Sequence, residues 1–130
     1  MIYLDTSVAL AHLLAEDRQP PAALWKQPLV SSRLLEYEVW TRIHARRLSR
    51  SHGEAARQLL SRLSFLELAQ AVLARALEPF PSPVRTLDAL HLSSIQFLRE
   101  RRVEVSLATF DVKMRRVAQR LGIELFGENA

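Results

Sequence analysis

The sequence predicts an α/β fold in which helices cover both faces of a parallel sheet. Short apolar runs of strand character alternate with longer amphipathic stretches, which is the pattern of repeated strand–helix–strand units. A length of 130 residues suits one domain with a substantial core. The chain has no cysteine, so a disulfide framework and a cysteine-ligated zinc site are excluded.

Elements of the two kinds are predicted from one end of the chain to the other. Apolar runs predict strands, and periodic stretches that begin near Ser, Thr or Asp predict helices. The predicted strands cover residues 2–4, 29–30, 65–68, 103–108 and 123–126. The predicted helices cover residues 5–15, a short segment near Trp25, and residues 34–47, 51–63, 69–77, 86–102 and 111–121.

Serine residues are expected to start two helices in the middle of the chain. Ser31 and Ser32 can cap the helix over 34–47, because their hydroxyls can accept from free N–H groups of the first turn. Ser51 and Glu54 have the S-x-x-E spacing of a capping box, so the next helix is predicted to begin there.

Proline, threonine and glycine set the expected boundaries further along the chain. Three prolines make residues 78–84 an extended loop, after which Thr86 is expected to cap a long helix. Gly122 is the expected C-cap of the last helix. Residues 127–130 are expected to fray.

Four acidic residues lie at strand ends or beside the apolar stripes of helices. Asp5 and Asp111 follow predicted strands, Asp88 opens a helix, and Glu38 lies in the middle of one. The carboxyl ends of parallel strands meet at one edge of a sheet, where α/β proteins build their sites. Carboxylates gathered there would repel one another, and a divalent cation is the usual way to stabilise such a cluster. The sequence therefore predicts a metal site made of these four acids.

Each of these residues also has a structural explanation. An aspartate at a helix start is stabilised by the helix dipole, and Glu38 can pair with Arg42 four residues later. His91 shares a helical face with Asp88 and is interpreted as a core histidine rather than a ligand. Three hydroxyl side chains beside the acids can either cap helices or orient carboxylates and metal-bound waters: Thr6, Ser7 and Thr109.

The exterior is basic and rich in arginine. The formal net charge is +4 at pH 7, the pI is about 10.3, and the basic residues are sixteen Arg and two Lys. Arginine binds phosphate in a bidentate manner, which favours a nucleic-acid partner, although a GC-rich genome explains the same bias. The first candidates for contact with the nucleic-acid backbone lie on or after the helix that carries Glu38: Arg42, Arg46, Arg47 and Arg50.

Targeting signals are not visible in the chain. No apolar run approaches the roughly 18 residues that span a bilayer, and the N-terminus lacks the basic region of a signal peptide. A cytoplasmic location without membrane contact is therefore expected.

At these residues the chain resembles the PIN-domain ribonucleases, and specifically the short VapC-type toxins of prokaryotic toxin–antitoxin pairs. The resemblance rests on four segments in the order of that family: IYLDTS over 2–7, SSRLLEYEV over 31–39, LDALHL over 87–92 and ATFD over 108–111. Each segment is weak alone, but together they are specific and contain all four acids. The resemblance implies one PIN-like three-layer domain over residues 1–130, with a short, mostly parallel sheet flanked by helices.

The resemblance also implies an activity. It indicates an Mg²⁺- or Mn²⁺-dependent endoribonuclease, often a homodimer, that a cognate antitoxin protein silences. Its catalytic residues and metal ligands would be Asp5, Glu38, Asp88 and Asp111, since hard oxygen ligands suit these cations. Hydrolysis of RNA by this chemistry would leave 5′-phosphate and 3′-hydroxyl ends.

Two alternatives stay open. A PIN-like module could bind RNA or protein without cutting, and a nuclease with the same chemistry could serve RNA maturation or cleave DNA. Other acid-bearing α/β domains are disfavoured by motif. A phosphoacceptor receiver needs an acidic cluster before the acceptor strand and a lysine after a late strand, whereas here Asp5 lies in the first strand and the lysines are Lys26 and Lys113. A dehalogenase-type phosphatase needs D-x-D where this chain has Asp5-Thr6-Ser7.

Overall fold

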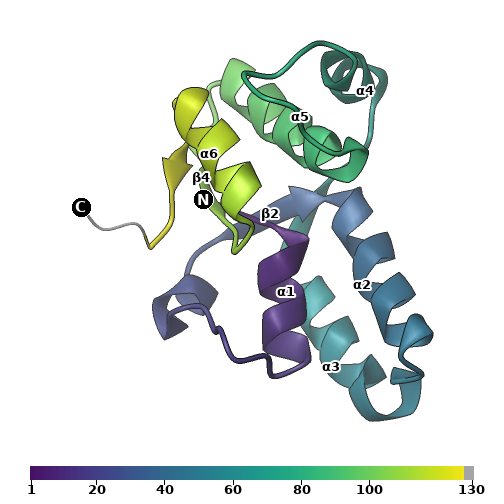
Figure 1. Cartoon of the computed structure of the whole chain (residues 1–130). Helices are drawn as coiled ribbons and strands as arrows, with labels where there is room; N and C mark the ends of the chain where they lie inside the picture. Colours follow the sequence, from purple (N-terminus) through teal and green to yellow (C-terminus); the bar gives the residue numbers. More distant parts are fainter. Residues whose placement is uncertain (128–130) are drawn as a thin grey trace.

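Strands and helices alternate along residues 1–127, the part of the chain that the computed structural model describes (Figure 1). Fraying was predicted for residues 127–130, and of these 128–130 lie outside the described residues. In chain order the elements are β1 (Ile2–Leu4), α1 (Thr6–Leu13), the 3-10 helix η1 (Ala22–Lys26), β2 (Leu29–Ser32), α2 (Arg33–Ala45), α3 (Ser49–Ser61), β3 (Leu63–Leu66), α4 (Gln70–Ala76), α5 (Thr86–Glu100), β4 (Ser106–Ala108), α6 (Val112–Arg120) and β5 (Glu124–Leu125).

The five described strands form one parallel sheet in the order β3-β2-β1-β4-β5, which confirms the predicted fold class. Strand β1 is central, with Ile2 opposite Leu29 of β2 and Leu4 opposite Ala108 of β4. The chain winds outward from β1 to β3 and then crosses to the other side of β1 for β4 and β5. The ends of β1 and β4 therefore flank the point where the winding reverses, which is where open α/β sheets hold their sites.

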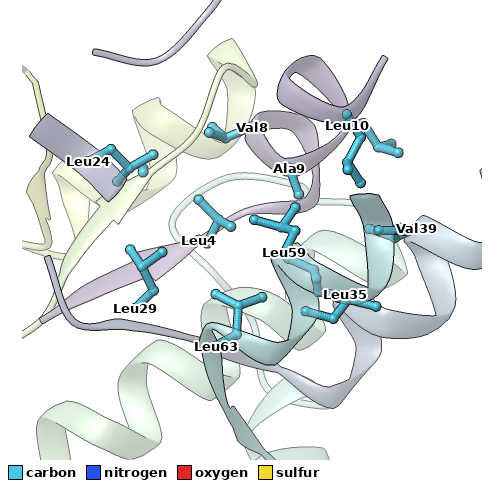
Figure 2. Packing of buried hydrophobic residues seen from close by; sticks show 14 of the residues in the cluster. Leu4, Val8, Ala9, Leu10, Leu24, Leu29, Leu35, Val39, Leu59 and Leu63 are labelled. Atoms are coloured by element: carbon cyan, nitrogen blue, oxygen red, sulfur yellow. The ribbon is translucent and has the colours of Figure 1, made fainter. Parts of the chain in front are cut away.

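One face of the sheet is covered by α1, α2 and α3, and their apolar side chains form the first core cluster (Figures 1 and 2). Leu4 points to this face and belongs to the same cluster as Val8, Leu35 and Leu59, all labelled in Figure 2. Leu4 and Leu35 have no exposed surface. Full burial of one such side chain contributes about 1.5–3 kcal/mol.

The opposite face is covered by α5 and α6, with α4 packed on the outside of α5 (Figure 1). Because side chains alternate along a strand, Tyr3 points to this face while its neighbour Leu4 points to the other. Tyr3 packs here with Leu92, Ile95 and Met114, all fully buried. The protein thus has three layers, helices, sheet and helices.

Four helices end in the same compact way, with a residue in the left-handed region: Ala15, Arg47, Arg102 and Gly122. The next N–H then donates to a carbonyl five residues back, as from Leu48 to Ile43 at 2.9 Å and from Val103 to Leu98 at 3.0 Å. This is the Schellman motif, which satisfies carbonyls at the helix end and turns the chain sharply. Gly122 fulfils its predicted role one residue past the cap position, Leu121.

The predicted capping box of α3 is wrong. The helix begins at Ser49, so Ser51 lies inside it, where its hydroxyl donates to the carbonyl of Leu48 at 3.3 Å. Glu54 pairs with Arg57 instead of bonding back to the backbone of Ser51. The cause is the tight end of α2, which delivers the chain directly into the next helix and leaves no segment in which a box could form.

Thr86 does not cap α5 either. The cap position belongs to Arg85, whose backbone is extended, and Thr86 is the first helical residue. Within the described residues no side chain caps this helix start, and Asp88 lies in its first turn, where a negative charge suits the helix dipole.

Four strands differ from their predicted bounds: β2 extends to Ser32, β5 covers only Glu124–Leu125, and β3 and β4 begin elsewhere than predicted. Strand β3 begins two residues early because Leu63 pairs with Leu29 and is buried in the first core cluster. Strand β4 begins only at Ser106, since the left-handed turn at Arg102 holds Val103 against the end of α5. No helix among residues 1–127 combines the length and the apolar content needed to cross a membrane.

Candidate active site

The four predicted acids line one cavity of about 390 Å³ at the carboxyl edge of the sheet. Asp5 occupies the cap position of α1, directly after β1, and Asp111 occupies that of α6 after β4. Glu38 lies on α2 and Asp88 in the first turn of α5. The fold therefore brings together residues that are far apart in the sequence.

Asp5 is held by two hydroxyl groups and is 5% exposed. The hydroxyls of Ser7 and Thr109 both donate to its Oδ2, at 2.6 and 2.7 Å. The hydroxyl oxygens of Ser7 and Thr109 in turn accept from the backbone N–H groups of Phe110 and Asp111, each at 3.0 Å. These bonds tie the end of β1 to the loop after β4, and they leave Oδ1 of Asp5 without a donor among the described residues.

Glu38 of α2 is also held by two hydrogen bonds. Its Oε1 lies 2.7 Å from both the hydroxyl of Thr6 and Nε2 of His91. Burial opposes ionisation, but the hydrogen bonds from His91 and Thr6 outweigh it, so the pKa of Glu38 is lowered. Within the described residues, Arg42 acts on Glu38 by charge, and the expected ion-pair contact between them is not formed.

Asp111 and Asp88 complete the cluster. Oδ1 of Asp111 accepts from the N–H of Met114 at 3.0 Å, which is a helix cap and leaves Oδ2 for other partners. Asp88 receives no hydrogen bond from the described residues. Burial, followed by the negative charges of Asp111 and Asp5, raises the pKa of Asp88 to about 6. Asp88 therefore lies in the combined field of the other acids.

The donor set matches the chemistry of a small, hard divalent cation. Among residues 1–127, Asp5, Glu38 and Asp111 each have one oxygen fixed by protein donors and one without such a donor, and both oxygens of Asp88 are without one. Mg²⁺ and Mn²⁺ take few carboxylates, in monodentate contacts, and keep several waters. Among residues 1–127 no three acidic or histidine groups are already arranged to enclose an ion. The fit therefore rests on the kind and number of oxygen donors, not on a preformed cage.

The predicted arginines are distributed unevenly around this cavity. Arg42 lines it, together with Arg85, which the sequence analysis did not single out. Arg46, Arg47 and Arg50 are exposed around the turn from α2 to α3 and do not line the cavity. The signal for Arg85 was its place three residues before Asp88, at the end of the proline-rich loop.

His91 was interpreted as a core histidine, and it is 1% exposed. It also bonds Glu38, which the sequence analysis did not foresee. Its spacing of three residues from Asp88 puts both side chains on one face of α5, and this was the available signal.

Comparisons with known proteins agree with this arrangement. Residues 2–120, which include all four acids, match the model of the PIN domain family. The chain is 32% identical over 126 residues to Ribonuclease VapC46 of Mycobacterium tuberculosis (strain ATCC 25618 / H37Rv), over 94% of this chain and 93% of that protein. It is 29% identical over 129 residues to Ribonuclease VapC35 of Mycobacterium tuberculosis (strain CDC 1551 / Oshkosh), over 95% of this chain and 93% of that protein.

Proposed function

The chain belongs to the PIN domain family, and we propose that it is a divalent-metal-dependent endoribonuclease, the toxin of a toxin–antitoxin pair. The observation that carries the proposal is the cavity lined by Asp5, Glu38, Asp88 and Asp111. Both relatives are named ribonucleases, which agrees with the proposal. A PIN-like module that binds without cutting is disfavoured, because none of the four acids is replaced.

In this proposal the four acids would hold Mg²⁺ or Mn²⁺ through their oxygens. The bound cation would polarise the scissile phosphate and lower the pKa of the attacking water. Ser7 and Thr109 hold Oδ2 of Asp5, so the carboxylate keeps its orientation toward the cavity. Arg42 and Arg85 line the same cavity and would bind backbone phosphates of the RNA.

The proposed inhibitor is an antitoxin protein that presents a basic side chain to the acids. Four carboxylates around one cavity attract an Arg or Lys, and Leu87 beside them is 46% exposed. An amphipathic segment of the antitoxin would place an apolar side chain on Leu87 and its basic side chain among the carboxylates. It would thereby compete with the metal and block the path of the phosphate. RNA and antitoxin are cytoplasmic molecules, so the proposal places the toxin in the cytoplasm.

We also propose that the protein acts as a homodimer. The exposed apolar residues of α4 support this, since Leu73 is 43% and Leu77 is 88% exposed. Both line an apolar groove of about 710 Å³ that α4 and the proline-rich loop form with the start of α5. Apolar surface of this kind is stabilised by burial against a second copy.

The test of the nuclease proposal is cleavage of end-labelled RNA by the purified protein. We expect cutting with Mn²⁺ or Mg²⁺, none with a chelator, and fragments that carry 5′-phosphate and 3′-hydroxyl ends. A DNA strand of the same sequence is the matched substrate control. Cleavage that persists in chelator, or no cleavage of any cellular RNA with either metal, would contradict the proposal. Sequencing of RNA 5′ ends after induction in cells would then identify the natural target.

A further inference from the structure

A buried chain of hydrogen bonds connects the central strand of the sheet to the proposed metal site. The hydroxyl of Tyr3 lies 2.7 Å from Nδ1 of His91, and Nε2 of His91 lies 2.7 Å from Oε1 of Glu38. Tyr3 is 0% and His91 is 1% exposed, and their rings meet edge to face. The three residues come from β1, α5 and α2, so this series of hydrogen bonds crosses the interior of the protein.

The partners of each atom fix the direction of these hydrogen bonds. An ionised carboxylate accepts and does not donate, so Nε2 of His91 carries the hydrogen that points to Glu38. In the neutral ring Nδ1 is then bare and accepts from the hydroxyl of Tyr3. The oxygen of Tyr3 in turn accepts from the N–H of Ser32 at 3.2 Å. Every donor in this series of hydrogen bonds therefore points toward Glu38.

This arrangement acts on one oxygen of the carboxylate. Oε1 of Glu38 also accepts from Thr6 at 2.7 Å, so two donors converge on it. Among the described residues no donor reaches Oε2, and Glu38 lines the cavity, so this oxygen stays available as a ligand. The charged form of Glu38 is stabilised and its rotamer is fixed.

Packing alone does not explain a tyrosine and a histidine in this place. Both lie in or beside an apolar cluster with Leu92 and Ile95, where Phe and Leu would fill space without burying polar atoms. Burial raises the pKa of Tyr3 well above its usual range, so its hydroxyl keeps the proton that His91 accepts. Buried polar groups of this kind fix one geometry when all their hydrogen bonds are made.

We propose that Tyr3 and His91 are positioning residues, which orient Glu38 so that Oε2 alone binds the divalent cation. The inference rests on the proposed function, because it assigns these residues to the metal site of the nuclease. His91 does not touch the metal or the RNA in this proposal and acts through Glu38. Tyr3 acts one step further back and keeps His91 in the tautomer that donates from Nε2.

The first test measures the affinity for Mn²⁺ without RNA, from the paramagnetic resonance signal of free Mn²⁺ during a titration. A Gln at position 91 can donate from a nitrogen close to that of Nε2, whereas the shorter Asn cannot reach Glu38. We expect His91→Asn to weaken Mn²⁺ binding by about 10- to 100-fold. His91→Gln is expected to stay within about threefold of the wild type, since one donor bond to Oε1 is kept.

Matched controls separate positioning from general stability. His52→Asn alters a histidine that bonds Ser51 away from the cavity, so Mn²⁺ affinity should not change. Melting curves of all variants report folding separately. Wild-type affinity in His91→Asn, or an equal loss in His91→Gln and His91→Asn, would overturn the proposal. If His91→Asn does not fold, Tyr3→Phe replaces it, with an expected weakening of about two- to fivefold, and unchanged affinity there overturns the proposal equally.

The second test needs neither metal nor activity. Nitrogen-15 resonances of the His91 ring distinguish the two tautomers in the wild-type protein. We expect hydrogen on Nε2 and a bare Nδ1, with the opposite tautomer gaining population in Tyr3→Phe. A hydrogen on Nδ1 in the wild type would overturn the proposal, because Nε2 would then face the carboxylate without a donor. A wild-type protein with the expected tautomer that binds no Mn²⁺ would refute the proposed function and, with it, the metal role of Glu38.

Discussion

The hydroxyl of Thr109 lies 2.7 Å from Oδ2 of Asp5, although 104 residues separate the two along the chain. The contact follows from the sheet, because Leu4 of β1 is paired with Ala108 of β4 and each site residue comes next after its strand. The position of Asp5 is therefore set by the pairing of two central strands and fixed by a hydroxyl from the neighbouring one.

Thr109→Val tests this contact with almost no change of shape. The variant loses the donor to Asp5 and the acceptor for the N–H of Asp111, so the free energy of unfolding should fall by about 1–2 kcal/mol. Mn²⁺ affinity should fall by about tenfold or more. Denaturant unfolding and an Mn²⁺ titration measure the two effects. Thr41→Val on the exposed side of α2 is the control, and equal behaviour of both variants would contradict the prediction.

Removal of one proposed ligand charge should abolish cleavage while the fold remains. Asp5→Asn and Asp88→Asn are each expected to lower the rate of RNA cleavage at saturating Mn²⁺ by at least about 100-fold, since metal polarisation supplies several kcal/mol. Circular dichroism and melting curves check the fold. Asp17→Asn removes an exposed acid outside the cavity and should keep full activity. Full activity in the two cavity variants would leave the mechanism without support.

Stability without metal should depend on pH through Asp88. Its pKa of about 6 in the folded protein lies above the ordinary value of 3.8, so the folded state binds the proton more tightly than the unfolded state. This stabilisation is complete below about pH 4 and is lost as the pH rises through about 6. Its size is on the order of 1–2 kcal/mol after allowance for solvent screening.

The measurement is a series of melting curves in chelator from pH 5 to 7.5, for the wild type and Asp88→Asn. The variant lacks the repelled charge, so its advantage in melting temperature should grow by a few degrees toward high pH. Addition of Mn²⁺ should stabilise the wild type and remove most of this advantage. Parallel curves for the two proteins in chelator would disprove the role of Asp88.

Arg42, which lines the cavity, should matter more for RNA than the arginines beyond it. In an Asp5→Asn background, which prevents cleavage, Arg42→Ala should weaken RNA binding and reduce the slope of log affinity against log salt by about 0.7. Arg50→Ala, at the start of α3, should change neither. Filter binding over a range of salt concentrations provides both quantities. Equal effects of the two substitutions would move the RNA path toward the turn between α2 and α3.

The apolar groove beside α4 should mediate self-association. The wild type is expected to run at twice its chain mass of 14.9 kDa in size exclusion with light scattering, and Leu77→Asp at the monomer mass. A charge buried in the interface without a partner is strongly unfavourable. Tyr37→Asp, also exposed but on α2, is the control and should remain dimeric. A monomeric wild type at micromolar concentration would refute the dimer.

The sequence was sufficient to predict the elements that carry the acids, because apolar runs and helical phase are local signals. The parallel sheet and its three-layer packing are confirmed. Asp5 and Asp111 could be placed at the sheet edge since each follows a strand, and both lie there. Their roles as ligands stay predictions.

Features that depend on contacts between distant segments could not be read from the sequence. The start of α3 at Ser49 depends on the Schellman turn at Arg47, where a non-glycine residue takes the left-handed conformation without a sequence signal. The bond from His91 to Glu38 spans 53 residues and the contact of His91 with Tyr3 spans 88. Pairings of this length arise from tertiary packing, so a helical pattern could place His91 on a face but could not name its partners.

The crossover from β3 back to the centre of the sheet also has a consequence for biosynthesis. Strand β4 pairs with β1, yet Thr109 leaves the ribosome 104 residues after Asp5. At a synthesis rate of about 5–20 residues per second this interval lasts roughly 5–20 s. Until then β1 can pair with β2, once that strand has been made, but not with β4, and Asp5 and Asp111 have not met. A partly synthesised chain therefore has no complete site until the loop after β4, with Thr109 and Asp111, has been made.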